Sequence, residues 1–189
     1  MDTVIFDLET TGLSPVRDEI IQIAGMRMRT GQVLESETFS TFVRPRQPIS
    51  GFISSYTGIT NHHVREAPGA AEALRAFSEF VGGAVLIAHN GRRFDMPFLR
   101  ESCAREGLET RPVGFFDSID FSKRVWGGRG GHGLDAVMAR LNLKADGERR
   151  HDARSDVRIL AEAVRRMWSQ FCPECRTSPV PQGTGVLAR

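Results

Sequence analysis

Residues 3–9 read Thr3-Val4-Ile5-Phe6-Asp7-Leu8-Glu9, an apolar and β-branched segment with two acids toward its carboxyl end. This composition predicts a strand in the middle of a sheet. Two more strand-like segments, residues 19–28 and 37–43, follow it after turns. Three successive strands joined by short connections predict an antiparallel meander, which ends at Pro45 and Pro48.

Beyond the meander, segments with the apolar spacing of a helix alternate with short apolar runs that are typical of buried strands. The helical segments are residues 49–56, 68–81, 95–105, 119–126, 134–143 and 152–171, and the strands are residues 84–88 and 112–116. We therefore expect an α/β protein with a mixed five-stranded sheet, its first three strands antiparallel, flanked by helices.

The chain has 189 residues, enough for one domain with a sizeable core and hardly enough for two. We assign residues 1–171 to this domain. From residue 172 onward prolines and glycines interrupt every pattern, so residues 172–189 are expected to form a flexible tail. Cys172 and Cys175 have the spacing of half a zinc site, but no second ligand pair lies nearby. Reduced thiols are the favoured interpretation.

Composition and charge leave most classes of soluble protein open. The formal net charge of +2 says little about partners, and no apolar run approaches the length of a membrane span. The chain enters a strand-like segment at once, without the pattern of a signal peptide. We therefore expect an intracellular protein with no membrane partner, although a targeting segment that had been removed would leave the same start.

Asp7 and Glu9 are two residues apart on the first predicted strand, so their side chains leave the same face of the sheet. Two like charges side by side in an apolar strand repel each other unless a cation lies between them. A polar strand end that runs into a turn is the alternative interpretation.

Two more acids stand where predicted elements begin. Asp95 follows the buried strand 84–88, at the end of the strand where open α/β sheets bind ligands, but it could also cap the next helix. Asp156 lies in the first turn of an amphipathic helix, where the helix dipole alone would favour an acid. His151, just ahead of that helix, titrates near neutrality.

Taken together, the four acids predict a metal site. Carboxylate oxygens are the ligands that Mg²⁺ and Mn²⁺ prefer. Asp7, Glu9, Asp95 and Asp156 could hold two such ions, which would activate a water and stabilise a leaving oxygen. His151 is placed to accept the proton of that water, and we rank His132, in the glycine-rich loop 127–133, well below it.

These residues resemble the three motifs of the DEDDh (DnaQ-like) 3′→5′ exonuclease family, which includes the epsilon proofreading subunit of bacterial DNA polymerase III. A TGIT stretch at residues 57–60 is also similar to the family, and Asp117-Ser118-Ile119 is similar to the branch of three-prime repair exonucleases. The resemblance covers about residues 3–170. The three motifs are Phe6-Asp7-Leu8-Glu9-Thr10-Thr11-Gly12, Ala88-His89-Asn90-Gly91 with Phe94-Asp95 and Phe98-Leu99, and His151 followed after four residues by Asp156.

The resemblance implies a ribonuclease H-like fold and metal-assisted hydrolysis that releases 5′-mononucleotides from a 3′ end. It implies that Asp7, Glu9 and Asp156 hold one ion, that Asp7 also contacts a second, and that Asp95 acts partly through water. His151 would be the general base. One departure is Gln22, where many members carry glutamate; we expect it to tune activity without abolishing it.

The same resemblance suggests a substrate site. Thr10 and Leu13 match positions that hold the terminal nucleotide, and Asn90 is assigned to the same set. Tyr56 stands where an apolar residue packs against a base, although core packing before a turn is an equal alternative. Arginine pairs at 92–93 and 149–150 could follow phosphates or simply be solvated.

The favoured function is a metal-dependent exonuclease that acts on single-stranded or frayed 3′ ends of DNA in preference to RNA. An exoribonuclease that trims RNA ends is the main alternative. A module that only binds nucleic acid or a polymerase is the alternative from another class, and the presence of Asp7, Glu9 and His151 argues against it. A polymerase or repair protein is a possible partner, and the oligomeric state is not predicted.

Overall fold

The three amino-terminal strands pair in chain order, as the sequence predicts. β1 (Asp2–Thr10) is antiparallel to β2 (Ile20–Arg29), and β2 is antiparallel to β3 (Gln32–Phe42). Thr30 and Gly31 both have positive φ, which lets the chain reverse tightly between β2 and β3. The structure is a computed structural model and describes residues 1–128, 130–144, 152–170 and 183–189.

The remaining strands extend the sheet on the other side of β1. β4 (Val85–Ala88) runs parallel to β1, and β5 (Thr110–Asp117) runs parallel to β4. The strand order is β3-β2-β1-β4-β5-β6, so the described sheet has six strands where the sequence predicted five. The carboxyl ends of β1, β4 and β5 therefore meet at one edge, where ligands bind in open α/β sheets.

The sixth strand corrects the prediction of a flexible tail for part of its length. β6 (Gly183–Ala188) pairs antiparallel with β5, and Leu187 and Ala188 are buried. The hydroxyl of Ser78 donates a hydrogen bond to the Ala188 carbonyl at 2.5 Å. These contacts come from distant parts of the chain, so a short glycine-containing segment could not reveal them by its own pattern. Residues 171–182 lie outside the described residues.

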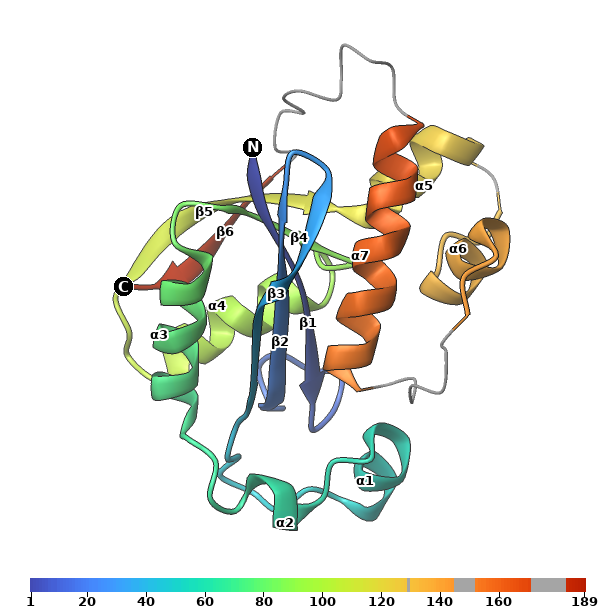
Figure 1. The fold of residues 1–189 in the computed structure, drawn as a ribbon. Coiled ribbons are helices and arrows are strands. Elements are labelled where there is room, and N and C mark those ends of the chain that lie inside the picture. The colour runs from blue at the N-terminus through green and yellow to red at the C-terminus, as the bar shows by residue number, and fades with distance from the viewer. Residues whose placement is uncertain (129, 145–151, 171–182) are drawn as a thin grey trace.

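Helices cover both faces of the sheet (Figure 1). α3 and α4 pack on one face, α5, α6 and α7 pack on the other, and α1 and α2 lie beyond the carboxyl end of β1. None of the helices in the described ranges is long and apolar enough to cross a membrane. Their bounds are α1 (Gly51–Thr57), α2 (Asn61–Val64), α3 (Ala70–Val81), α4 (Asp95–Arg105), α5 (Ser118–Trp126), α6 (Leu134–Leu141) and α7 (Ala153–Ser169).

The alternation of β1 determines where its acids point. Val4, Phe6 and Leu8 belong to the core that includes α3 and α4. Ile5 belongs to the core that includes α7. Because side chains alternate along a strand, Asp7 and Glu9 leave the sheet on the α7 face together with Ile5. The predicted α/β architecture is confirmed, and this register positions the site described next.

Candidate active site

Three of the predicted site acids converge at the carboxyl end of β1. Oxygen atoms of Asp7, Glu9 and Asp156 all lie within 4.8 Å of one another. Glu9 and Asp156 are buried, and Asp7 is half-buried. Residues from strand one and from a helix about 150 positions later thus form one cluster, as the sequence predicts.

The start of α7 is what brings Asp156 to this cluster. Asp152 is the N-cap residue, and its carboxylate accepts a hydrogen bond from the backbone N–H of Arg154 at 3.0 Å. The N–H of Asp156 then donates to the Asp152 carbonyl at 3.0 Å. One turn on, Leu160 is buried in the core shared with β1, so the helix lies flat on the sheet with its first turn over the acids.

Asp95 lies beside this cluster but is not one of its three members. It is the first residue of α4, with Phe94 as N-cap, so the helix-cap alternative does not describe its position. Its side chain is 2% exposed, and the backbone of Leu8 donates a hydrogen bond to it. Its Oδ1 atom has no hydrogen-bond partner among the described residues.

Burial dominates the electrostatics of Asp95. The pKa of this carboxyl is raised to about 7, chiefly by loss of solvent and also by the neighbouring carboxylate of Asp117. A buried acceptor without a partner costs about 1–3 kcal/mol. Asp95 is therefore a poorly solvated acid next to Leu8, in a position where a cation or a cation-bound water would satisfy it.

Asp117 is a structural residue of the site that the sequence suggested only through a family-like triplet. Its carboxylate accepts backbone N–H groups of Asn90 at 3.0 Å and Arg92 at 3.1 Å. It also caps α5 by accepting the N–H of Ile119 at 3.0 Å. These contacts fix the turn between β4 and α4, and with it the place of Asp95.

A cleft of about 610 Å³ opens beside the acids. Of the predicted substrate residues, Thr10, Leu13 and Tyr56 line it, whereas Asn90 does not. Asn90 is exposed in a left-handed turn, with φ of 59°. The residues that line the cleft are Asp7, Leu8, Glu9, Thr10, Thr11, Gly12, Leu13, Ser50, Phe52, Ile53, Tyr56, Thr57, Phe94 and Asp156.

Large apolar side chains are exposed at this cleft. Leu13 is 85% exposed, Phe52 is 76% exposed and Tyr56 is 51% exposed. The rings of Phe52 and Tyr56 are stacked, with centroids 6.3 Å apart and an interplanar angle of 11°. Tyr56 is therefore not a core residue, and Phe52, which the sequence analysis did not single out, joins it because the two lie one turn apart on α1.

Several of the residues predicted from the sequence lie outside the described ranges. His151, the predicted general base, lies outside the described residues, as do Cys172, Cys175 and the arginines at 149–150. His132, the rival base, is described. Its Nδ1 lies 2.7 Å from the hydroxyl of Ser122 on α5, and it does not line the cleft.

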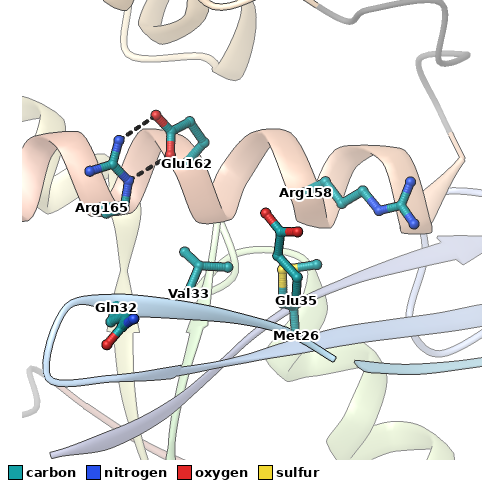
Figure 2. Close-up of a pocket in the computed structure, with 7 residues that line it drawn as sticks. All are labelled: Met26, Gln32, Val33, Glu35, Arg158, Glu162 and Arg165. Carbon is teal, nitrogen blue, oxygen red and sulfur yellow. Dashed lines mark hydrogen bonds and ion pairs between the residues drawn. The ribbon is translucent and has the colours of Figure 1, made fainter. Parts of the chain in front are cut away.

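A second cavity, the α7–hairpin groove, lies between α7 and the strands β2 and β3 (Figure 2). It has a volume of about 510 Å³ and contains none of the predicted site residues. Both signs of charge line it, and Glu162 and Arg165 form an ion pair at 2.7 Å. Its lining residues are Met26, Gln32, Val33, Glu35, Arg158, Glu162 and Arg165.

The donor set of the acid cluster fits a divalent cation. Three carboxylates supply only oxygen atoms, which suit hard cations such as Mg²⁺ and Mn²⁺. None of the described residues that line the cleft is an arginine, lysine or histidine. The Oδ1 atom of buried Asp95, which has no hydrogen-bond partner among the described residues, is a second observation that favours a cation here.

Comparisons with known proteins agree with this geometry. A family model described as an exonuclease matches residues 4–164. A DNA polymerase III subunit epsilon-like protein of Rhodobacter capsulatus is 42% identical over 166 residues, covering 87% of this chain and 23% of that protein. A PolC-type DNA polymerase III of Streptococcus thermophilus is 36% identical over 159 residues, covering 83% of this chain and 11% of that protein.

Solved structures share the fold. The nuclease domain of 3′hExo, a DEDDh family member bound to rAMP, superposes with a TM-score of 0.80 at 23% identity, covering 90% of this chain and 93% of that one. Exonuclease X in complex with 5′ overhanging duplex DNA superposes with a TM-score of 0.72 at 24% identity, covering 91% and 95%.

This chain spans less than a quarter of the length of the two polymerase-related proteins. The match nevertheless extends over most of the chain and includes the strands and helices that carry the acids. The ribonuclease H-like architecture predicted from the sequence is thereby confirmed. The chain belongs to the DEDDh (DnaQ-like) exonuclease family.

Proposed function

We propose that this chain is a divalent-metal-dependent 3′→5′ exonuclease that hydrolyses terminal phosphodiesters and releases 5′-mononucleotides. The observation that carries the proposal is the convergence of Asp7, Glu9 and Asp156 within 4.8 Å beside an open cleft. A binding module without catalysis would not need three carboxylates held together against their mutual repulsion.

The proposed cofactor is Mg²⁺, in two sites, with Mn²⁺ as a substitute. Asp7, Glu9 and Asp156 would hold one ion, Asp7 would also contact the other, and Asp95 would act partly through water. When bound, such ions acidify a water and stabilise the charge of a leaving oxygen. The high pKa of Asp95, raised by burial to about 7, supports a role that depends on a nearby cation, because a cation favours its charged form.

His151 is the proposed general base. It stands five positions before Asp156 in the sequence, immediately ahead of the N-cap of α7. An imidazole in that position would take the proton of the attacking water, because its ordinary pKa lies near neutrality. The support for this role comes from the sequence spacing alone.

The cleft supplies the proposed binding surface for the 3′-terminal nucleotides. The exposed faces of Tyr56 and Phe52 offer stacking platforms for bases, each worth about 1–3 kcal/mol. Leu13 lies on the same cleft and would contact the terminal nucleotide together with the backbone near Thr10. Stacking does not depend on base identity, so we expect activity on single-stranded or frayed ends of any sequence.

DNA is the proposed substrate because both of the polymerase-related proteins compared above carry DNA polymerase III names. Those names also support association with a polymerase. RNA is the second candidate, since the nuclease domain of 3′hExo is bound to rAMP. The site acids serve both substrates, so discrimination would arise at the 2′ position of the sugar.

End-labelled oligonucleotides test the proposal. Single-stranded DNA, duplex DNA and RNA of one sequence are incubated with Mg²⁺, Mn²⁺ or chelator, and products are resolved by length. We expect a ladder that shortens from the 3′ end, release of 5′-mononucleotides, and no reaction with chelator. Internal cuts, shortening from the 5′ end, or full activity in chelator would each reject the proposal.

A further inference from the structure

Gln22 is a buried polar residue that connects two parts of the site. It lies on β2 directly opposite Glu9 of β1 and is 1% exposed. Its Oε1 atom accepts a hydrogen bond from the backbone N–H of Ala153 at 3.1 Å. Ala153 is the first residue of α7, so one side chain joins the strand pair that carries Glu9 to the helix that carries Asp156.

The other end of the same amide serves a second partner. Gln22 also hydrogen-bonds the carboxylate of Asp152, the N-cap of α7. The pKa of Asp152 is lowered first by its hydrogen bond from Arg154, against the effect of burial, and Gln22 lowers it further. An amide can do both, because it carries one acceptor oxygen and a donor NH₂ group.

The pair explains why an amide stands at this position. A glutamate side chain could still accept the N–H of Ala153, but it has no donor for Asp152 when ionised. Two carboxylates would then face each other where residue 22 is buried and Asp152 is half-buried, and like charges repel there. The identity of residue 22 is thus coupled to the identity of residue 152, which the sequence could not indicate because 130 positions separate them.

We propose that Gln22 is a positioning residue that fixes the first turn of α7, so that Asp156 meets Glu9 in the divalent-cation site. This inference rests on the proposed function, since it assumes that the cluster binds a cation. Asp156 lies about one turn after Ala153 on α7, and its backbone N–H donates a hydrogen bond to the carbonyl of Asp152. A shift of the helix start would therefore carry the Asp156 carboxylate away from Asp7 and Glu9.

Mn²⁺ binding tests the positioning role of Gln22 without any substrate turnover. Binding is measured as the loss of the electron paramagnetic resonance signal of free Mn²⁺. We expect Gln22→Glu to weaken binding about tenfold, the lower end of what outer contacts contribute to metal affinity. The reciprocal swap Gln22→Glu with Asp152→Asn restores one amide and one carboxylate. We expect it to bind Mn²⁺ as the wild type does.

Controls separate positioning from folding. Gln47→Glu makes the same chemical change at an exposed loop position and should leave Mn²⁺ binding unaltered. Far-ultraviolet circular dichroism monitors the fold of each protein. If Gln22→Glu does not fold, Gln22→Met removes both hydrogen bonds without adding charge and should still weaken Mn²⁺ binding.

Two different failures are distinguishable. If the wild type binds Mn²⁺ no better than Asp7→Ala, the cation site itself is wrong and the proposed function falls with it. If the wild type binds Mn²⁺ but Gln22→Glu, or Gln22→Met where the glutamate variant does not fold, binds it equally well, only the positioning role is wrong. A double variant that stays as weak as Gln22→Glu would also reject it, because the coupling to Asp152 would be absent.

Discussion

The two cavities that border α7 differ in the residues that surround their carboxylates. In the α7–hairpin groove, Glu162 accepts hydrogen bonds from Arg165 at 2.7 Å and from Arg166 at 2.6 Å. In the active-site cleft, Asp156 lies on the same helix only six positions earlier, and no described lining residue is cationic. In the groove Glu162 is bound by the protein's own arginines, whereas in the cleft three carboxylates converge at the place where we propose a cation.

The difference supports the proposal that the acids of the cleft, and not Glu162, are functional. An acid held by arginines has its charge satisfied, and the pKa of Glu162 is lowered, chiefly by its hydrogen bond from Arg165. Acids that lie close together repel one another, and natural proteins retain such clusters where a ligand compensates for the repulsion. The same residue type on one helix therefore has a structural role at one end and a proposed catalytic role at the other.

Removing an acid from the cleft should have the largest effect. Asp7→Ala is expected to reduce exonuclease activity by more than about 1,000-fold, because the cation contribution amounts to several kcal/mol and each 1.4 kcal/mol is a factor of ten. The fold should persist, since the change relieves repulsion. Single-turnover digestion of labelled DNA measures the loss of activity. Turnover near the wild-type rate would contradict the proposed functional role of the acids in the cleft.

His151→Ala tests the base that we propose beside the cleft. We expect kcat to fall about 100-fold or more, the usual contribution of a general base. The acid limb of the pH–rate profile near neutrality should vanish, while Mn²⁺ binding stays. An unchanged pH–rate profile would remove His151 from the mechanism.

The apolar wall of the cleft should affect substrate binding more than chemistry. Tyr56→Ala is expected to raise KM about tenfold, because stacking on one base contributes about 1–3 kcal/mol. Steady-state kinetics with single-stranded DNA give kcat and KM separately. Tyr56→Phe keeps the ring and serves as the matched control, and a loss confined to kcat would contradict a stacking role.

Asp95 should lower the stability of the metal-free protein as pH rises. Its pKa is raised from 3.8 to about 7. Its contribution is therefore fully present below about pH 4 and is lost as pH rises through about 7. Asp95→Asn should remove this loss and raise metal-free stability at pH 8 by about 1–3 kcal/mol. Urea unfolding in chelator at pH 5 and pH 8 measures it, and equal pH dependence in both proteins would contradict it.

The groove should show the smallest effect. Glu162→Gln is expected to lower the free energy of unfolding by less than about 1 kcal/mol, as for partly exposed ion pairs. Because the pKa of Glu162 is lowered, the difference should disappear as pH falls through its folded pKa. Activity and Mn²⁺ binding should not change. A loss of activity here would mean that the two cavities are not independent.

The sequence by itself determined the features that follow from local periodicity. The alternation of β1 placed Asp7 and Glu9 on one face, and the spacing of apolar residues in α7 turned Asp156 toward the sheet. The start of α4 at Asp95 was likewise predicted, as were the meander and the two further strands of a mixed sheet. These features depend on neighbours two to four positions away, so they can be predicted from the sequence.

Only the tertiary structure decided what depends on distant partners. It made β6 a strand through pairing with β5, and it buried Asp95 against Leu8. It left Phe52 and Tyr56 exposed over the cleft, and it joined Gln22 to the start of α7. Burial and hydrogen bonding between segments that are far apart in the chain have no periodic signature. The sequence could therefore name most of the acids, while packing decided which of them converge in one cluster.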